Sequence, residues 1–236
     1  MYISGSIPHI PHGITCITGS GGKTSLIKYL SLTLSGTVIV TTTTHMYPFS
    51  GMPLIDAGKI NDCRPELILK ELLQKELERN RVVCFGSLLP SGKLSSPSDM
   101  LRPEELIPLA DYILIEADGS RQLPLKAHRP NEPVIPAGTS LTIGVNGASG
   151  IGKPLCEVCH CPELFASIAG IDINTPVQIE HIASVVNYED TSDCYYINQT
   201  DLLPDLADAV KLCELINRKA YAGSLKFKTE NRPLPY

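Results

Sequence analysis

The residues whose types and spacing most clearly predict chemistry are Gly19-Ser20-Gly21-Gly22-Lys23-Thr24-Ser25, which follow a short apolar run and open a helical one. Glycines let backbone N–H groups approach phosphate oxygens, and the N-terminus of a helix presents a positive dipole end. Lys23 has the reach to contact terminal phosphates as a catalytic group, and the Thr24 hydroxyl is a ligand for Mg²⁺. The run therefore predicts a phosphate-binding loop; the alternative is a glycine-rich turn before a helix.

This glycine-rich run departs from the common pattern G-x-x-x-x-G-K-[ST], because Ile17 stands at the place of the first glycine. In the form G-[ST]-x-G-K-[ST] it resembles the phosphate loop of Mur-type ligases, which departs at the same place. That resemblance implies, as one alternative function, an ATP-dependent ligase that activates a carboxylate as an acyl phosphate. We expect the remaining chain to be too short for the amino-acid-binding domain of such a ligase, which counts against it.

Two acids mark the end of the predicted strand Asp111–Glu116. A phosphate loop needs a carboxylate at the end of a neighbouring strand to hold Mg²⁺. We assign that metal-binding and catalytic role to Glu116, which ends the apolar run, together with Thr24. Asp118 is the alternative metal carboxylate, or the catalytic group that orients an attacking water. The opposing interpretation is that both acids only cap a loop.

Four consecutive threonines, Thr41 to Thr44, precede His45 at the end of the second predicted strand. The carboxyl ends of strands form the edge at which open α/β sheets bind ligands. A threonine here is a candidate contact for the γ-phosphate or Mg²⁺, and we name Thr44 as a candidate substrate contact. The β-propensity of threonine explains the run equally well.

The tetrad Asn198-Gln199-Thr200-Asp201 follows a late predicted strand. It resembles the base-reading motif N-K-x-D of GTPases, in which the aspartate accepts hydrogen bonds from guanine and the asparagine braces the loop. Gln199 stands where that motif has lysine, so the stacking aliphatic stem is altered. The alternative is a helix start in which Thr200 or Asp201 is the N-cap. We expect Mg²⁺ with ATP or GTP as the cofactor, with a slight preference for GTP.

A loop rich in proline and basic residues follows Glu116 and extends to Pro136. Prolines restrict φ and stiffen a loop, which suits the holding of cations in fixed places. We expect Arg121 to stabilise developing charge as a catalytic residue. The remaining basic residues are candidates for binding an anionic substrate: Lys126, His128 and Arg129. The alternative is a solvated basic loop, which would not need this density of proline.

Three segments together resemble the YqeC family: Gly19–Ser25, Thr41–Met46 and the stretch EADGSR…LPLKAHRPNEPVIP from Glu116 to Pro136. This family comprises selenium-dependent hydroxylase accessory proteins, also called selenium cofactor biosynthesis proteins. The resemblance runs from Gly13 to about Asp201. It implies a P-loop NTPase-like protein that helps to mature selenium-dependent molybdenum hydroxylases or their cofactor.

One departure from the family concerns the segment Val158-Cys159-His160-Cys161-Pro162-Glu163, where such proteins tend to read V-H-R-P-E. A role for an arginine at that place is therefore not carried over. With Cys156, the segment also gives the spacing C-x₂-C-H-C, a set of soft ligands for Zn²⁺ or an iron–sulfur cluster. A thiol group that handles selenium or sulfur is the other alternative. We favour ordinary loop cysteines and a helix that starts at Cys161-Pro162-Glu163, because no second C-x-x-C is near.

Alternating apolar strands and helices predict an α/β fold with a mostly parallel sheet and helices on both faces, P-loop NTPase-like. We expect one domain over residues 1–236, with a frayed tail at Thr229–Tyr236. The predicted strands are Gly13–Thr18, Thr37–Thr41, Arg81–Phe85, Asp111–Glu116, Leu141–Val145 and Cys194–Ile197. The predicted helices are Lys23–Leu34, Pro65–Asn80 and Leu203–Ala220, and two long segments, Leu88–Arg102 and Gly119–Gly138, are expected to be functional loops.

Composition excludes several classes of protein. A net charge of −5 and the absence of tryptophan argue against a nucleic-acid partner. No apolar run approaches the roughly 20 residues of a membrane span, and the first residues lack a signal-peptide pattern. The eight cysteines are too few for a disulfide scaffold of this length, so we expect a cytoplasmic protein with reduced thiols.

Three functions remain after this comparison of motifs. The first is a magnesium-dependent nucleoside triphosphate hydrolase that acts in the maturation of a molybdenum hydroxylase, with Leu88–Arg102 admitting a second substrate. The second is a nucleotide-gated binding or chaperone module without substrate chemistry of its own. The third is the Mur-like ligase. A hydroxylase or its cofactor is the expected partner in the first two cases.

Overall fold

The computed structural model describes residues 7–226, so the predicted tail Thr229–Tyr236 lies outside the described residues. The strands are β1 Gly13–Gly19, β2 Val38–Thr42, β3 His45–Met46, β4 Leu54–Asp56, β5 Val82–Leu88, β6 Leu94–Ser95, β7 Tyr112–Glu116, β8 Leu125–Lys126, β9 Thr139–Gly147, β10 Cys159–His160, β11 Cys194–Asn198 and β12 Lys219–Ala222. The α-helices are α1 Lys23–Thr33, α2 Pro65–Arg79, α3 Leu155–Val158, α4 Pro162–Ala169, α5 Ile179–Glu189 and α6 Ala207–Leu215. Short 3₁₀ turns are η1 Ala57–Lys59, η2 Pro103–Leu106, η3 Ala148–Gly150 and η4 Thr200–Leu202.

Ten strands form one sheet in the order β12-β11-β9-β1-β7-β2-β5-β6-β3, with β4 paired to β5. Pairing is parallel from β12 to β5 and for β4, and antiparallel where β6 meets β5 and β3. The strands β8 and β10 form a separate parallel pair. The predicted α/β class with a mostly parallel sheet is therefore confirmed.

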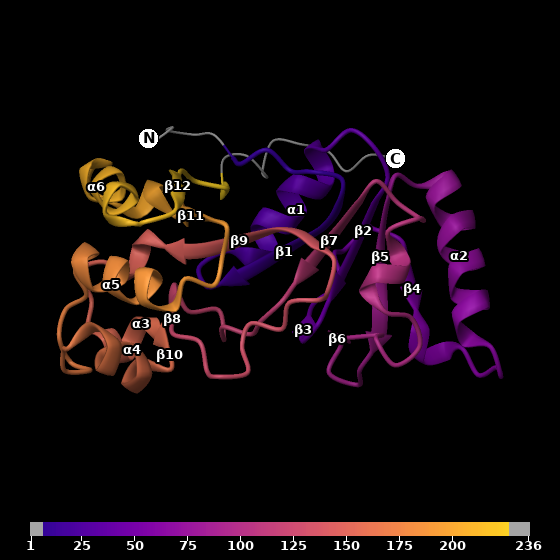
Figure 1. The fold of residues 1–236 in the computed structure, drawn as a ribbon, viewed down its shortest axis with the longest axis horizontal. Helices are drawn as coiled ribbons and strands as arrows, with labels where there is room; N and C mark the ends of the chain where they lie inside the picture. The colour runs from indigo at the N-terminus through magenta and orange to yellow at the C-terminus, as the bar shows by residue number, and fades with distance from the viewer. Residues whose placement is uncertain (1–6, 227–236) are drawn as a thin grey trace.

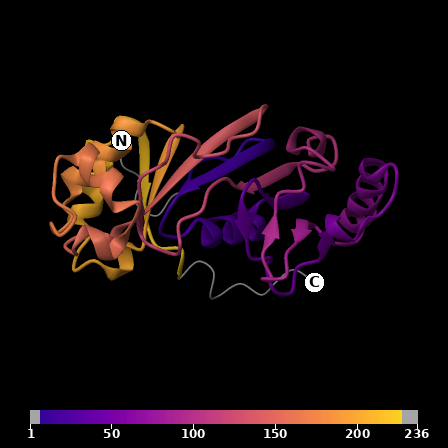
Figure 2. The ribbon, with the colours of Figure 1, turned by 90° about the horizontal axis from the view of Figure 1, so that it is seen from below.

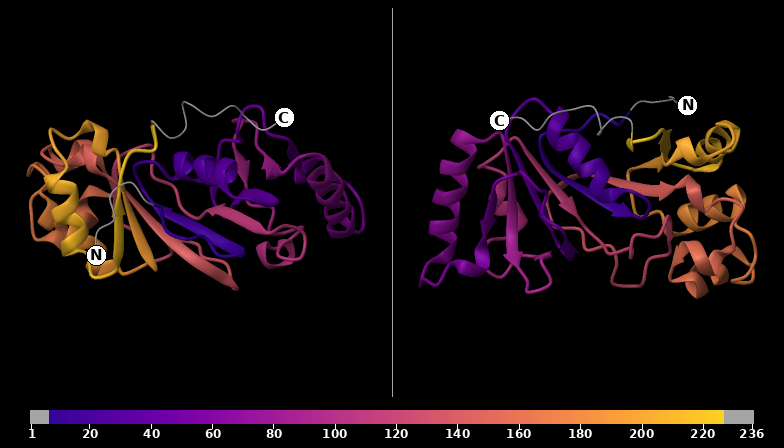
Figure 3. Two further views of the ribbon diagram at one scale, coloured as in Figure 1. Left: turned by 90° about the horizontal axis from the view of Figure 1, so that it is seen from above. Right: turned by 180° about the vertical axis from the view of Figure 1, so that it is seen from behind.

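Both faces of the central strands are covered, which explains their continuous apolar runs. In β7, Tyr112 and Leu114 belong to the cluster that includes α1, whereas Ile113 and Ile115 belong to the cluster that includes α2. Figure 2 and Figure 3 show α1 against the central strands, α2 at one end of the molecule and α3 to α6 at the other. The alternation of side chains along a strand thus divides the core between the two faces.

Helix α2 confirms the predicted helix Pro65–Asn80 to within one residue. Its leucines at four-residue spacing, Leu69, Leu73 and Leu77, are the buried positions. Pro65 occupies the first turn, where its missing N–H costs nothing. Burial of each leucine side chain stabilises the fold by roughly 1.5–3 kcal/mol.

The predicted helix Leu203–Ala220 is wrong at both ends. Helix α6 spans only Ala207–Leu215, and the chain then turns so that Lys219–Ala222 pairs in parallel with β11 as strand β12. Leu206 is exposed, and the buried residues of α6 are Ala209, Leu212 and Cys213. Tertiary pairing with β11 thus overrides the helical pattern of the last residues.

Side chains of α4, α5 and α6 form a further core cluster with side chains of β11 and β12. Figure 1 shows these helices beside the two strands. The predicted helix start at Cys161-Pro162-Glu163 is confirmed by α4, which begins at Pro162. Helix α5 has no counterpart among the predicted elements. Its last residue, Glu189, reaches the site described below.

The carboxyl ends of β1, β2, β7, β9 and β11 lie at one edge of the sheet, because all five strands are parallel. The register places Glu116 beside Ile17 of β1 and beside Thr42 of β2. The predicted loop Leu88–Arg102 contains β6, which pairs with both β5 and β3 and so extends the sheet over this edge. In the described part of the chain, no helix is long and apolar enough to cross a membrane.

Candidate functional site

A cleft of about 660 Å³ opens at the carboxyl edge of the sheet. It is lined by residues 21–25, 44–47 and 119–122 together with Lys93, Glu116, Arg129, His160 and Gln199. Among the described residues that line it, Glu116 is the one carboxylate. Another cavity, of about 440 Å³, lies at the amino ends of the strands beside His12 and Asp111, and no predicted site residue lines it.

The Thr24 hydroxyl and the Glu116 carboxylate meet at this cleft, as expected for a metal-binding pair. Thr24 Oγ1 donates a hydrogen bond of 2.8 Å to Glu116 Oε2. Thr24 lies in the first turn of α1 and Glu116 ends β7, so the helix start and the strand end bring the two side chains together. Burial raises the pKa of Glu116, against the opposing effects of Lys23 and of the Thr24 hydrogen bond.

Three backbone amides of the glycine-rich run, those of Gly19, Ser20 and Gly21, donate hydrogen bonds within the protein, so they are not free for the predicted contacts with phosphates. Gly19 N–H donates to Asp118 Oδ2 at 2.8 Å, Ser20 N–H to Val145 O at 2.8 Å, and Gly21 N–H to Leu123 O at 3.1 Å. One reason is that β1 continues in register with β9 to Gly19, one residue past the predicted strand Gly13–Thr18. The first amides of α1, those of Lys23 to Ser25, lack acceptors within the helix, as at any helix N-terminus.

Close packing against β9 and β11 explains why these positions are glycine. Gly21 has a φ of 80°, and a Cβ there would lie 2.4 Å from the backbone nitrogen of Gly147. Gly22 has a φ of 132°, and its Cβ would lie 2.1 Å from Asn198 Nδ2. The glycine pattern is therefore required by the fold, whether or not a phosphate binds.

Lys23 is held in a buried position by three acceptors. Its Nζ forms an ion pair of 2.8 Å with Asp118 Oδ1 and donates to Gly19 O at 2.6 Å and to Ser120 Oγ at 3.0 Å. The Lys23 side chain is only 2% exposed and that of Asp118 is fully buried. Asp118 thus binds Lys23 and the amide of Gly19, and it does not take the predicted place of a metal ligand or of a group that orients water in the cleft.

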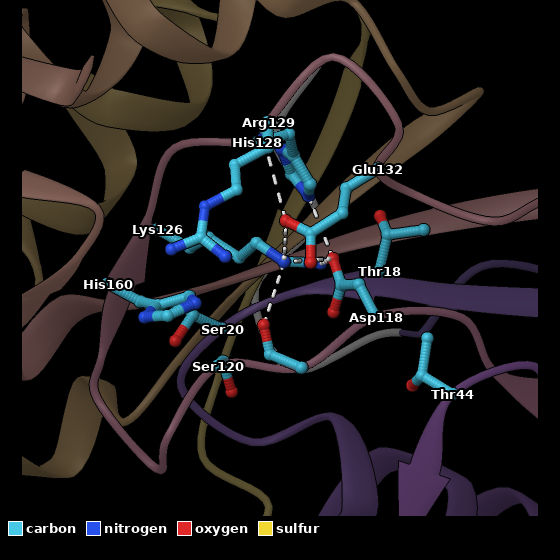
Figure 4. Close-up of polar contacts among 12 residues, drawn as sticks. Thr18, Ser20, Thr44, Asp118, Ser120, Lys126, His128, Arg129, Glu132 and His160 are labelled. Atoms are coloured by element: carbon cyan, nitrogen blue, oxygen red, sulfur yellow. Dashed lines mark hydrogen bonds and ion pairs between the residues drawn. The ribbon is translucent and has the colours of Figure 1, made fainter. Parts of the chain in front are cut away.

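Asp118 is the centre of a larger buried network of charges (Figure 4). Lys126 Nζ lies 3.4 Å from Asp118 Oδ2 and 2.9 Å from Glu132 Oε2, and it donates to Gly119 O at 2.7 Å. The two ring nitrogens of His128 lie between carboxylates, with Nε2 2.8 Å from Asp118 Oδ2 and Nδ1 2.6 Å from Glu189 Oε2. Three cationic side chains and three carboxylates therefore balance one another behind the glycine-rich run.

The ionisation of the network follows from these contacts. Burial opposes ionisation of Asp118, but the His128 hydrogen bond and the charges of Lys23 and Lys126 outweigh it and lower its pKa. Burial likewise disfavours the charged form of His128, but its hydrogen bonds with Asp118 and Glu189 raise its pKa to about 9. His128 is consequently an imidazolium at neutral pH and donates from both ring nitrogens.

The structure divides the four basic residues of the loop that follows Glu116. Arg121 and Arg129 line the cleft, as expected for residues that contact an anion. Lys126 and His128 were predicted to bind substrate, but they are buried in the network and do not line the cleft. Their carboxylate partners explain this, because a buried charge is stable only when it is paired.

Of the four threonines Thr41 to Thr44, two of which end β2, only Thr44 lines the cleft. Thr42 Oγ1 donates to the backbone oxygen of Glu116 at 2.8 Å and accepts from the amide of Thr44 at 3.0 Å. Thr43 Oγ1 donates to Val134 O at 2.9 Å. Thr42 and Thr43 therefore fix the turn that carries Thr44 and tie it to the loop Gly119–Gly138.

The tetrad after β11 supports the glycine-rich run. Asn198 Nδ2 donates to Gly21 O at 2.8 Å, which agrees with the predicted bracing role of this residue. Asp201 is exposed on η4 and does not line the cleft, which does not fit the predicted contact with guanine. Gln199 lines the cleft instead, with a positive φ of 63° and a hydrogen bond of 2.6 Å from Ser149.

The cysteines at 156, 159 and 161 differ in their surroundings. Cys156 is exposed on α3, Cys159 is buried in β10, and Cys161 is half-buried at the start of α4. Burial raises the pKa of the Cys159 thiol to about 12. Within residues 7–226, no group of three or more histidine, cysteine, aspartate or glutamate side chains is arranged to hold a metal ion.

Several residues of the site have no counterpart among the predicted ones. Lys93 directly precedes β6 and Tyr47 directly follows β3, and these two-residue strands carry no periodic signal in the sequence. His160 was considered only as a soft metal ligand, but it lines the cleft. Glu132 and Glu189 also have no counterpart among the predicted site residues, because the role of each comes from an ion pair, with Lys126 and with His128, that the sequence does not show.

Comparison with known proteins adds a family. The family model described as "YqeC protein" matches residues 15–163. The chain is 33% identical over 186 residues to "Uncharacterized protein YqeC" of Escherichia coli (strain K12), and the match covers 74% of this chain and 68% of that protein. No solved structure matches the chain. The region matched by the family model contains Thr24, Glu116 and His160 and ends before Asn198.

Proposed function

The chain belongs to the YqeC family, and we propose that it is a magnesium-dependent nucleoside-triphosphate-binding protein of the P-loop NTPase type that hydrolyses its nucleotide. The observation that carries this proposal is the hydrogen bond between Thr24 and Glu116 at the start of α1, inside the cleft. A hydroxyl and a carboxylate beside a helix N-terminus form the donor set that Mg²⁺ and a phosphate chain require together.

The cleft has the charge and the size for this ligand. Lys23, Lys93, Arg121 and Arg129 line it, against a single carboxylate among the described lining residues. Its volume of about 660 Å³ lies within the range of small-molecule sites. Thr24 and Glu116 would hold the metal ion, and the amides of the first turn of α1 would bind the phosphates.

Phosphate binding requires a rearrangement of Lys23. Its Nζ is paired with Asp118 and is nearly inaccessible, so an incoming phosphate must compete with that carboxylate. Bound Mg²⁺ supplies Lewis-acid stabilisation of the phosphate oxygens. Exchange of partners by Lys23 would bring its charge to the ligand and leave Asp118 with Lys126 and His128.

The cellular role in the proposal follows the family. We propose that the nucleotide-bound protein acts as an accessory in the maturation of selenium-dependent molybdenum hydroxylases or of their cofactor. The choice between ATP and GTP stays a prediction, and the exposed position of Asp201 removes one reason to favour GTP.

A second candidate is a nucleotide-gated binding module, and the network around Asp118 favours it. His128 joins Asp118 behind the glycine-rich run to Glu189 at the end of α5. A change of partner at Lys23 would therefore alter the charge balance at Asp118 and His128, and through His128 the contact with Glu189 of α5. Slow turnover together with nucleotide-dependent capture of a hydroxylase supports this candidate, and capture that ignores the nucleotide counts against it.

The test is calorimetric titration of Mg-ATP and Mg-GTP into the wild-type protein and into Glu116→Gln. Glutamine keeps the shape and an acceptor for Thr24 but loses the charge that holds Mg²⁺. We expect at least one nucleotide to bind the wild type in a Mg²⁺-dependent manner. The affinity of the variant for that magnesium–nucleotide complex should be lower by about tenfold or more.

The matched control is Asp201→Asn, which removes an exposed carboxylate outside the cleft. We expect it to bind both nucleotides as the wild type does. Turnover measured on the same samples separates a hydrolase from a binding module. Indifference of the wild type to both nucleotides, with and without Mg²⁺, overturns the proposal.

A further inference from the structure

The arginines of the loop after Glu116 differ from its other charged residues in having no paired carboxylate. Asp118 and Glu132 are occupied by Lys23, Lys126 and His128 in the buried network. Within residues 7–226, no ion pair joins the side chain of Arg121 or Arg129 to a carboxylate. The loop thus separates its charges, with a neutral network inside and two unpaired guanidinium groups at the cleft.

His160 lies beside these two arginines. It lines the same cleft, and its strand β10 pairs with β8, so that His160 stands opposite Lys126 in register. The amide of Ala127 donates to His160 O at 3.1 Å, which fixes the backbone there. Figure 4 shows Arg129 and His160 on the same side of the buried network, away from Thr44.

The electrostatic surroundings of His160 are cationic. Burial lowers its pKa, and the charges of Lys126 and Arg121 lower it further; Glu132 raises it, and Arg129 lowers it by a smaller amount. The neighbouring cations that disfavour protonation of the imidazole create a positive potential at this place. That potential disfavours a further cation and favours an anion. Arginine also binds oxyanions through two parallel hydrogen bonds.

We propose that Arg121, Arg129 and His160 form a binding subsite for a phosphate-class oxyanion of a second substrate, separate from the phosphate position at Thr24 and Glu116. Thr24 and Glu116 lie on α1 and β7, whereas the subsite is built from the loop after Glu116 and from β10, and all five residues line the same cleft. The subsite rests on the proposed function only for its description as a second-substrate site.

The second ligand is therefore an anionic molecule that carries a phosphate-class group, and it enters the cleft beside the nucleotide. Lys93, which precedes β6, and Tyr47, which follows β3, line the same cleft, with Lys93 Nζ 5.2 Å from the centre of the Tyr47 ring. Lys93 and Tyr47 come from other segments of the chain, so Arg121, Arg129 and His160 are the residues that the loop after Glu116 and β10 contribute to the cleft.

The test follows the ring protons of His160 by NMR while inorganic phosphate is added at constant ionic strength. One series contains the protein alone, and the other contains a saturating magnesium complex of a non-hydrolysable triphosphate. Phosphate bound by the two arginines stabilises the imidazolium. We expect the pKa of His160 to rise by about half a unit or more in both series.

Arg129→Gln should abolish the rise, and its far-UV circular dichroism should match the wild type because the side chain has no ion pair within the described residues. The matched control Arg64→Gln removes an exposed cation at the start of α2 and should keep the rise. An equal loss in both variants would show a general charge effect and overturn the subsite.

The remaining outcomes are decisive as well. No rise in either series overturns the subsite. A rise that disappears when the triphosphate is bound shows that the arginines serve the nucleotide, which overturns the separate subsite. A rise in the protein alone, with no triphosphate binding detected by calorimetry, removes the proposed function and retains the oxyanion site.

Discussion

At the scale of single residues, the site is defined by which charges are paired and which are not. Lys23, Lys126 and His128 are each held by carboxylates in the interior, whereas Arg121 and Arg129 face the cleft. Burial makes each pairing obligatory, since an isolated charge in the interior costs several kcal/mol. The identity of each buried residue is therefore constrained by its partner.

Asp118→Asn tests how strongly the interior depends on this pairing. The substitution leaves Lys23, Lys126 and His128 with one carboxylate fewer, so we expect the free energy of unfolding to fall by about 3–5 kcal/mol. Urea denaturation followed by circular dichroism measures the loss. The matched control Asp190→Asn breaks an exposed pair with Arg218 and should be close to neutral. Equal effects of the two variants would contradict the role of Asp118.

The dependence of stability on pH should carry the signature of His128. Its pKa in the folded protein is about 9, against a reference value of 6.5 for the unfolded chain. The stabilisation is fully present below the unfolded value and is lost as the pH rises through about 9, a total of about 3 kcal/mol. Asp118 acts in the opposite sense, because its lowered pKa gives stability that is lost only in acid.

Urea unfolding of the wild type and of His128→Gln at about pH 6 and about pH 9.5 measures this contribution. We expect the wild type to lose more stability than the variant over that interval. Parallel profiles would show that His128 is not an imidazolium in the folded protein.

At the scale of elements, the glycine-rich run is a short connection between β1 and α1 that is pressed against neighbouring backbone. The register of β1 with β9 carries the strand to Gly19, and Gly21 then passes close to Gly147 and Pro124. Asn198 at the end of β11 binds the carbonyl of Gly21 from the other side. The loop is thus fixed by three separate segments before any ligand binds.

A pair of glycine substitutions separates backbone strain from crowding. Gly21 and Gly92 have nearly the same φ, 80° and 78°, but a Cβ at Gly92 would meet nothing within 4 Å. We expect Gly92→Ala to cost about 1–2 kcal/mol from strain alone. Gly21→Ala should cost roughly 1–3 kcal/mol more, because the atoms that it meets belong to the backbone and cannot rotate away. Thermal unfolding of both variants measures the difference, and similar values would contradict the packing of this loop.

The comparison of sequence and structure also belongs to the scale of elements. The long strands could be predicted because a parallel sheet covered on both faces needs continuous apolar runs, as in Tyr112–Glu116. The strands β3, β6, β8 and β10 could not, since two residues carry no periodicity and their pairing is decided by the tertiary fold. Helix α6 ends early for the same reason.

The site divides in a similar way. The pairing of Thr24 with Glu116 could be predicted, because a local motif and a strand end specify it. The contact of His128 with Glu189 joins residues 61 positions apart, and Glu189 lies on a helix without a predicted counterpart. No local pattern distinguishes a basic residue that is buried and paired from one that faces the cleft. The sequence therefore predicts the same substrate-binding role for Lys126 and for Arg129.

At the scale of the whole molecule, the strands connect the core clusters. In β11, Tyr195 and Ile197 belong to the cluster of α4 to α6, whereas Cys194 and Tyr196 belong to the cluster that contains α1. In β7, the side chains are divided between the α1 and α2 clusters. Each cluster therefore shares backbone with its neighbour across the sheet.

This sharing predicts one cooperative unfolding transition. We expect the midpoints measured by far-UV circular dichroism and by tyrosine fluorescence to coincide. Tyrosine is a suitable probe because the chain has nine tyrosines and no tryptophan. Two separated transitions would show that the helical cluster α3 to α6 unfolds independently and would contradict the single domain predicted for the chain.

The buried pair of Lys23 and Asp118 has a consequence for ligand selectivity. Asp118 is an internal competitor, since any ligand that recruits Lys23 must offer the ammonium group a better partner than a carboxylate 2.8 Å away. A nucleoside monophosphate carries too little negative charge to displace Asp118 from Lys23, whereas a triphosphate carries several oxyanion groups. Under the proposed function, affinity should therefore rise steeply from AMP to ADP to ATP in a calorimetric series. Asp118 would then set the selectivity for phosphate chain length without contacting the nucleotide.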